Sequence, residues 1–368
     1  IGRYALELLD GLAATAPSAA PGAEIVLLSS ERADPRGLWR RFETHHLRGC
    51  HLLPALMTAG NLALRRAARR LKLDVIHDPN GIAPFAAAHP ATRHLVTIHD
   101  AFAFVYPEQQ AALDTWRYRL MLPRVLRRAD RVLTDSAHSR RDLLRYLPLK
   151  QELVEVVHCG INERFRPAGP AAIDAVLRRY GLEQPFVLYV GSINGRKNIA
   201  RLFEAFALVR ERLPGLKLVM GGAKQWQTAE LEATYDRLDL AADVVWTGYL
   251  ADEDLPALYS AARAFVFPSL YEGFGLPPLE AMACGTPVVT SDTSSLPEVA
   301  GDAALLIDPL DPRALAAAIA RICGDEELRA ELRARGLAQA ARFHWHRAAE
   351  AVWGAYQRAL APAGAAGE

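Results

Sequence analysis

Two glutamates with seven residues between them carry the strongest chemical signal in this sequence. They bound the segment Glu272-Gly-Phe-Gly-Leu-Pro-Pro-Leu-Glu280. Adjacent prolines fit the first turn of a helix, where a missing backbone N–H costs nothing. The backbone N–H groups of Phe274, Gly275 and Leu276 would then point from a helix start, which favours an anion such as a diphosphate. Glu280 could accept hydrogen bonds from ribose hydroxyls, and Glu272 could reach a sugar.

A glycine turn that carries two adjacent cations is the second signal. It runs from Tyr189 to Asn198, where an apolar strand ends at Gly191 and a helix begins after Arg196 and Lys197. Cations at a helix start oppose the helix dipole, so their placement lowers stability unless an anion offsets them. We therefore interpret the turn as part of an anion site rather than as an exposed basic loop.

Short apolar strands alternate with amphipathic helices along the whole chain. Strands are expected at residues 25–28, 75–77, 95–98, 132–134, 154–157, 186–190, 216–220, 244–246, 264–267, 288–290 and 304–307. Nearly continuous apolar runs of this kind are typical of parallel strands that are covered on both faces. The alternation predicts an α/β protein with doubly wound sheets, whose ligands bind at the carboxyl ends of the strands.

The length of 368 residues favours two domains. The stretch Arg164–Gly169 contains prolines and glycine and is the best linker candidate. We expect an N-terminal domain over residues 1–165 and a C-terminal domain over 166–345, facing a central cleft. Because the helix that opens at Gly2 has no strand before it, the N-terminal domain is expected to lack a first strand and a glycine turn, a segment of about 15–20 residues.

Composition restricts the class of protein further. The four cysteines, Cys50, Cys159, Cys284 and Cys323, lie far apart and form no C-x-x-C pair. This spacing argues against a disulfide framework and against a zinc site, and it fits a reducing cytoplasm. No apolar run reaches membrane-spanning length and no secretory signal is evident, so a cytoplasmic protein is expected.

The net charge of +1 is shared unevenly along the chain. Residues 1–160 carry 22 Lys and Arg against 16 Asp and Glu, and the remainder carries 21 against 26. The basic residues cluster at 65–72 and at 124–131. Either these are solvated helix faces, or they contact anionic lipid or an anionic acceptor at the inner face of the plasma membrane. No nucleic-acid partner is expected.

Taken together, these motifs resemble retaining glycosyltransferase family 4, and within it the mannosyltransferase-B-like group. The resemblance covers essentially the whole chain. The segments that carry it are Gly2-Arg3-Tyr4-Ala5, Thr97–Asp100, Tyr106–Glu108, Thr134–Ser139, Val157–Asn162, Gly191–Asn198, Thr247–Leu250 and Glu272–Glu280. It implies the GT-B fold, two Rossmann-like domains, with helix 346–361 crossing back to the N-terminal domain.

The resemblance also implies roles for the residues in these motifs. Arg196 and Lys197 would neutralise the diphosphate of a nucleotide-sugar donor, and Glu280 would hold its ribose. The backbone of Gly248-Tyr249-Leu250 would face the base. Glu272 and the N–H groups of Phe274, Gly275 and Leu276 would grip the transferred sugar.

His99 is the candidate for approaching that sugar at the reacting carbon, from a strand end of the N-terminal domain. The sequence departs from the family at Ser192, where many relatives have an arginine directly after the glycine of the phosphate turn. Arg196 would have to take over the role of that arginine. Fewer features of the sequence therefore support the role assigned to Arg196 than the role assigned to Lys197.

A metal site is not expected. Asp252-Glu253-Asp254 matches the D-x-D pattern of metal-dependent glycosyltransferases, but it directly precedes a predicted helix at 255–262, so capping and first-turn acids explain it. No carboxylate stands out as a covalent nucleophile, which leaves the retaining route open between front-face and double displacement. Stabilisation of the leaving diphosphate would come from fixed cations and a helix start.

The expected function is metal-independent transfer of a hexose from a nucleotide sugar to a saccharide or lipid-linked acceptor in surface polysaccharide synthesis. The resemblance favours GDP-mannose as donor. Two alternatives stay open: a UDP-sugar-dependent transferase of the same fold, and a non-catalytic nucleotide-sugar-binding protein, since a fold does not determine a function.

Overall fold

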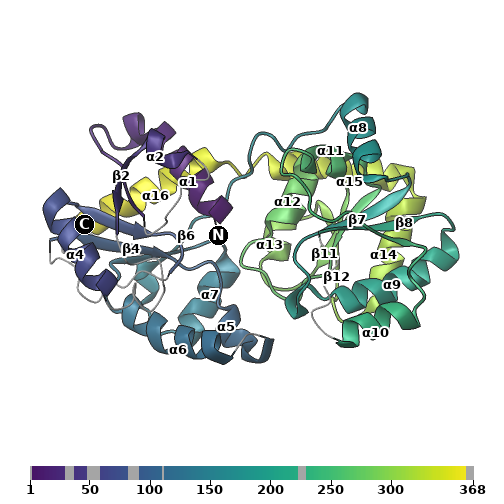
Figure 1. Cartoon of the computed structure of the whole chain (residues 1–368), viewed down its shortest axis with the longest axis horizontal. Helices are drawn as coiled ribbons and strands as arrows, with labels where there is room; N and C mark the ends of the chain where they lie inside the picture. The colour runs from purple at the N-terminus through teal and green to yellow at the C-terminus, as the bar shows by residue number, and fades with distance from the viewer. Residues whose placement is uncertain are drawn as a thin grey trace. The chain divides into compact units, whose positions relative to one another are not determined.

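The computed structural model describes residues 2–29, 37–47, 59–81, 91–109, 112–222 and 229–361. The chain divides into two compact units, one formed by Ile1–Gly160 with Trp345–Glu368 and the other by Ile161–His344 (Figure 1). The division falls a few residues before the expected linker. Residues 161–169 belong to the second unit because Ile161 donates its N–H to Phe343 O and Ala168 donates its N–H to Ser260 Oγ. The expectation of a disordered tail at 362–368 lies outside the described residues.

The first unit contains a four-stranded parallel sheet in the order β3-β4-β5-β6 and a separate parallel pair, β1-β2. Its elements are α1 (Gly2–Ala19), β1 (Val26–Ser29), α2 (Leu38–Arg41), β2 (Glu43–His46), α4 (Ala59–Leu71), β3 (Val75–Asp78), β4 (Arg93–Thr97), α5 (Phe102–Val105), η2 (Pro107–Gln109), α6 (Ala112–Leu126), β5 (Arg131–Thr134), α7 (Ala137–Tyr146), η3 (Gln151–Leu153) and β6 (Val154–Val156), with α16 (Trp345–Leu360) added from the end of the chain. Strand β2 was not predicted. Its sequence, Glu-Thr-His-His, is polar and carries no strand pattern, and only its pairing with β1 makes it a strand.

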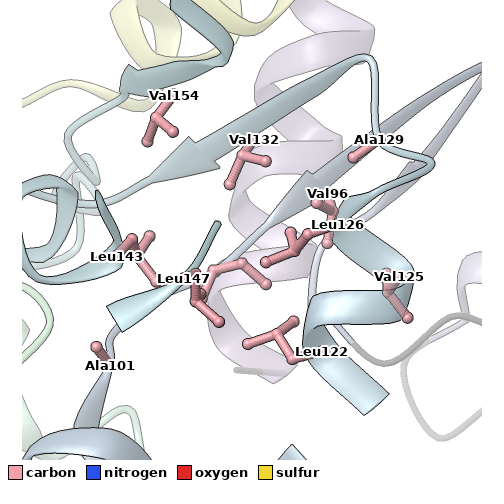
Figure 2. Packing of buried hydrophobic residues seen from close by; sticks show 11 residues of the cluster. Val96, Ala101, Leu122, Val125, Leu126, Ala129, Val132, Leu143, Leu147 and Val154 are labelled. Carbon is pink, nitrogen blue, oxygen red and sulfur yellow. The ribbon is translucent and has the colours of Figure 1, made fainter. Parts of the chain in front are cut away.

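A buried apolar cluster fastens helices α6 and α7 to this sheet. Val96 and Val132 on neighbouring strands pack with Leu126 of α6 and Leu143 of α7 (Figure 2). The strand residues are fully buried, as expected for parallel strands covered on both faces.

Helix α16 packs along α1, so the end of the chain completes the first unit, as predicted. The two helices approach closely at Gly11, where an added Cβ would lie 3.0 Å from the carbonyl oxygen of Trp345. Trp353 Nε1 donates a hydrogen bond to the carbonyl oxygen of Leu12 at 3.2 Å. His77 Nδ1 on β3 lies 2.8 Å from the hydroxyl of Tyr356, which links α16 to the sheet as well.

The second unit is built on a six-stranded parallel sheet in the order β12-β11-β10-β7-β8-β9. Its elements are α8 (Pro170–Tyr180), β7 (Phe186–Val190), η4 (Gly195–Lys197), α9 (Ile199–Arg212), β8 (Lys217–Gly221), α10 (Ala229–Arg237), β9 (Val244–Trp246), α11 (Leu255–Ala261), β10 (Ala264–Phe267), α12 (Leu276–Ala283), β11 (Val288–Ser291), α13 (Leu296–Ala300), β12 (Ala304–Ile307), α14 (Pro312–Gly324) and α15 (Glu326–Ala340). Strand β7, the first strand of this unit, lies in the middle of the sheet, with β8 and β9 on one side of it and β10, β11 and β12 on the other. The strand order therefore reverses between β7 and β10, and in open α/β sheets ligands bind at that reversal.

The prediction of two Rossmann-like α/β units with parallel sheets is confirmed, and the strand order of the second unit is that of a doubly wound sheet. Among the residues that the structure describes, no helix is both long enough and apolar enough to cross a membrane.

The hydrogen bonds of His77 lead to a prediction about pH. Burial, together with the neighbouring His99, lowers the pKa of His77 to about 4, whereas an unfolded chain has a histidine pKa near 6.5. Between these values the unfolded state binds more protons than the folded state, so stability falls as pH falls from about 6.5 towards 4. At pH 5 the loss amounts to about 2 kcal/mol.

We expect His77→Gln to remove this contribution. Chemical unfolding of the wild type and the variant at pH 7 and pH 5 should show a larger loss in the wild type. Comparing pH slopes cancels any constant cost of the substitution and any contribution of shared histidines that do not interact with His77. Equal slopes would contradict a neutral, buried His77.

Candidate functional site

The two sequence motifs meet at the point where the strand order of the second sheet reverses. The glycine turn follows β7, the Glu272 segment follows β10, and these strands are neighbours. The loops are bonded directly to each other, because the N–H of Leu270 donates to the carbonyl oxygen of Arg196 at 2.8 Å, and the hydroxyl oxygen of Ser269 lies 3.1 Å from the same carbonyl oxygen. Two segments far apart in the sequence thus form one site.

A buried ion pair joins the two loops through their side chains. Lys197 Nζ lies 2.6 Å from Glu272 Oε1, and each residue is only 7% exposed. Arg196 Nη1 lies 3.8 Å from the second carboxylate oxygen, Oε2. Lys197 Nζ also lies 4.6 Å from the centroid of the Phe267 ring. Because removing two charges from water is costly, such a pair is weak evidence for a role in stability alone and is more typical of a binding site.

The conformation of the cationic turn depends on two asparagines. The side chain of Asn194 accepts a hydrogen bond from the N–H of Lys197 and so caps η4. Asn198 has a left-handed backbone with φ of 58°. Its side-chain amide donates to the carbonyl oxygens of Pro268 and Pro309 at 3.1 and 2.6 Å. These bonds hold the turn against the loop after β10, and therefore determine where Lys197 points.

Three serines that the sequence did not single out hold Glu272 in place. Ser269 Oγ donates to Glu272 Oε1 at 2.5 Å. Ser294 Oγ accepts from the N–H of Glu272 at 3.0 Å, and Ser295 Oγ contacts the carbonyl oxygens of Glu272 and Phe274 at 2.9 and 2.7 Å. Serine is a common residue without a distinctive spacing here, so no sequence signal could have identified these contacts.

Helix α12 begins as predicted, with Leu276 first and the two prolines in the first turn. Gly275, directly before it, has φ of 116°, a conformation that side chains rarely adopt, and an added Cβ would lie 2.9 Å from Leu296. The segment Phe274–Leu276 therefore stands at a helix start, beside Lys197 and Glu272. A partial positive charge at the helix start adds to that of the two cations.

Glu280 differs from the sequence-based expectation. It is 4% exposed, and its Oε2 accepts a hydrogen bond from the hydroxyl of Tyr259 at 3.0 Å. We expected this carboxylate to face a ligand rather than the core, but Tyr259 is a fully buried core residue. Glu280 therefore has a core partner of its own, which the sequence could not reveal because Tyr259 lies on a different helix.

The segment Gly248–Leu250 lies at the same edge of the sheet, after β9. Gly248 forms an antiparallel bridge with Gly222, which follows β8. The side chain of Tyr249 is 85% exposed. The backbone of this segment is thus held next to the carboxyl end of β8, the neighbour of β7.

The explanation of the acidic run as a helix cap was wrong. Asp254 stands at the cap position of α11, but its side chain makes no capping hydrogen bond. It instead pairs with Arg179 at 2.7 Å and accepts from the hydroxyl of Tyr180 at 2.8 Å. Asp252 lies 3.5 Å from Arg164. Within the described ranges, no group of three or more His, Cys, Asp or Glu residues is arranged to hold a metal ion.

His99 belongs to the first unit and lies just after β4. Its Nδ1 is 2.6 Å from Asp135 Oδ2 and its Nε2 is 3.0 Å from the carbonyl oxygen of Pro79. Burial by itself would lower the pKa of His99, but the Asp135 carboxylate outweighs burial, and the pKa is raised. Because both ring nitrogens face acceptors, the protonated imidazolium satisfies both contacts. Tyr4 packs its ring edge to face with this imidazole, at 4.6 Å between centroids.

Comparisons with known proteins agree with this geometry. Residues 1–165 match the family model "Glycosyltransferase Family 4", and residues 178–339 match "Glycosyl transferases group 1". The chain is 38% identical over 297 residues to O-antigen chain mannosyltransferase B of Escherichia coli, covering 79% of this chain and 76% of that protein. It is 34% identical over 242 residues to serotype-specific mannosyltransferase WbdA of Escherichia coli, but spans only 29% of that protein's length.

Among solved structures, sucrose-phosphate synthase from Thermosynechococcus elongatus is similar, with 25% identity and a TM-score of 0.78, covering 97% of this chain and 92% of that one. Two Rossmann-like units with a cationic turn and a helix start at the strand reversal define a GT-B glycosyltransferase. The relatives make the assignment narrower: the chain belongs to glycosyltransferase family 4, as the sequence motifs predicted.

The left-handed backbone at Asn198 leads to a testable prediction. Asn198→Ala and Asn198→Gly both lose the bonds to Pro268 and Pro309, but only alanine also carries a Cβ in the left-handed region. We expect the alanine variant to be less stable than the glycine variant by about 1 kcal/mol.

Denaturant unfolding of the two variants measures this difference, read from the transition of the second unit. In an ordinary helix position the order would be reversed, with alanine the more stable. That reversed order would contradict the backbone conformation described for the turn.

Proposed function

We propose that this chain transfers mannose from GDP-mannose to a saccharide or lipid-linked acceptor in surface polysaccharide synthesis, with retention of configuration and without a metal ion. The observation that carries the proposal is the buried Lys197–Glu272 pair with Arg196 beside the start of α12. A diphosphate needs cations and N–H donors, and both converge at this one place. The two relatives named as mannosyltransferases support the choice of sugar.

In this proposal the donor's charge is stabilised by groups that are already in position. Lys197 and Arg196 neutralise the diphosphate, and the helix start at Phe274–Leu276 donates N–H groups to it or to the sugar. Glu272 accepts hydrogen bonds from sugar hydroxyls. Glu280 holds the ribose, and the backbone of Gly248–Leu250 faces the base.

His99 would act on the sugar from the first unit. As an imidazolium held by Asp135 and Pro79, it has both N–H groups directed at protein acceptors. We therefore propose that it contributes positive charge near the reacting carbon rather than a proton. Such a charge would stabilise the departing diphosphate as its bond to the sugar breaks.

A donor assay tests the proposal. We expect release of nucleoside diphosphate from GDP-mannose to exceed that from UDP-glucose and UDP-N-acetylglucosamine, and to survive EDTA. A preference for a uridine donor would overturn the mannose assignment in favour of a UDP-sugar transferase. Loss of turnover with EDTA that manganese restores would overturn metal independence. Binding of a nucleotide sugar without turnover of any would indicate a non-catalytic binding protein.

The matched control for the assay is a pair of lysine variants. Lys197→Ala removes a buried cation, and we expect it to lower kcat/KM for the donor by the equivalent of a few kcal/mol. Lys150→Ala removes an exposed cation, whose contribution is less than about 1 kcal/mol. Equal kinetics in the two variants would remove Lys197 from the site.

We further propose that the first unit contacts an anionic membrane surface through α4. Its exposed face carries Arg65, Arg66, Arg69 and Arg70, with Leu62 53% exposed nearby. A cluster of arginines next to an exposed apolar residue favours anionic lipid, with about 1 kcal/mol for each basic residue near the surface. A saccharide acceptor on a lipid carrier would then be presented close to the enzyme.

Vesicle sedimentation distinguishes this contact from a solvated basic face. We expect binding to vesicles containing phosphatidylglycerol to fall at least tenfold in a variant with Arg65→Glu and Arg69→Glu. The control variant, Arg124→Glu with Arg127→Glu, changes the other basic cluster by the same charge and should bind as the wild type does. Equal binding to vesicles of phosphatidylcholine alone would argue against the proposal.

A further inference from the structure

Glu272 lies where a negative charge opposes the binding of a diphosphate. Its carboxylate is paired with Lys197 at 2.6 Å and with Arg196 at 3.8 Å, the two cations that the proposed function assigns to the donor's phosphates. An anion that approaches Lys197 therefore meets a carboxylate that already occupies one side of the ammonium group. In a site that is nearly closed to water, repulsion between such charges is weakly screened.

The carboxylate cannot readily move aside. Ser269, which is fully buried, donates its hydroxyl to the same oxygen that Lys197 contacts. The backbone of Glu272 is held on both sides, its N–H by Ser294 and its carbonyl oxygen by Ser295. These three contacts hold the charge of Glu272 beside Lys197.

The charge of Glu272 affects the nucleotide-sugar donor and the nucleoside diphosphate product differently. In a nucleotide sugar, the terminal phosphate is esterified, and the hydroxyls of the sugar can donate hydrogen bonds to the carboxylate. On transfer, the bond between the anomeric carbon and the diphosphate oxygen breaks and the oxygen keeps the electron pair. The acceptor oxygen forms the new bond and releases its proton to solvent. The nucleoside diphosphate left behind has gained negative charge and lost the hydroxyl donors.

We propose that Glu272 acts as a fixed counter-ion of Lys197 and Arg196 that makes the site select the intact nucleotide sugar over the nucleoside diphosphate product. The inference rests on the proposed function, since it assumes that the two cations bind the donor's diphosphate. It gives Glu272 a second effect beside holding the sugar. Its charge lowers the affinity for the product and so favours product release.

Calorimetric titration of wild type and Glu272→Gln tests the inference, with GDP and GDP-mannose as ligands, or the uridine pair if the wild type prefers it. Glutamine keeps the shape and removes the charge. We expect the variant to bind the nucleoside diphosphate at least tenfold more tightly than the wild type, and to bind the nucleotide sugar no more tightly. Unchanged or weaker binding of the diphosphate by the folded variant would overturn the inference.

Glu280→Gln is the matched control. It removes the same charge eight residues further along the chain, about one turn into α12, from a carboxylate that bonds Tyr259 rather than Lys197. We expect no gain in affinity for the nucleoside diphosphate, and an equal gain in both variants would overturn the specific role of Glu272. If Glu272→Gln does not fold, Ser269→Ala frees the carboxylate from its buried anchor, and about threefold tighter diphosphate binding is expected. No gain in that variant would count against the inference.

The outcomes separate this inference from the proposed function. A wild type that binds neither nucleotide sugar contradicts both. A wild type that turns over a nucleotide sugar, combined with a glutamine variant whose affinity for the diphosphate does not rise, contradicts the counter-ion role alone.

Discussion

The buried contact between Lys197 and Glu272 is the interaction on which the described site depends. Each charge is almost removed from water, so each needs the other, and the loops that carry them must be held at hydrogen-bonding distance. The turn after β7 and the loop after β10 meet this requirement through bonds to Arg196 O and through Asn198. The two loops can meet because the strand order reverses between β7 and β10, which brings the carboxyl ends of these two strands side by side.

The first unit shows a different use of buried polar groups. His77 and His99 are both enclosed, yet burial lowers the pKa of one while Asp135 raises that of the other. The difference follows from their partners. His77 faces the hydroxyls of Thr97 and Tyr356, which a neutral ring can satisfy, whereas His99 faces a carboxylate and a carbonyl oxygen, which both require a donor. The same residue type thus links the sheet to α16 in one place and pairs with a carboxylate in the other.

Several features were predictable because their causes are local. Proline and glycine at the start of α12 act through backbone geometry, and the apolar runs of the core strands act through burial on both faces of the sheet. Strand β2 could not be predicted, since its polar sequence becomes a strand only by pairing with β1. The role of Asp254 was also mistaken, because a capping position can be read from the sequence whereas the presence of Arg179 and Tyr180 cannot.

The sequence by itself determined the class of fold and the family, and it predicted which residues could bind a diphosphate, since each of these depends on residue types at short spacing. Only the tertiary structure decided how those residues are paired. Lys197 reaches Glu272, Glu280 reaches Tyr259, and three serines hold the Glu272 segment. Such contacts join side chains from separate loops and helices, so they arise from the packing of the sheet, and no short segment of sequence encodes them.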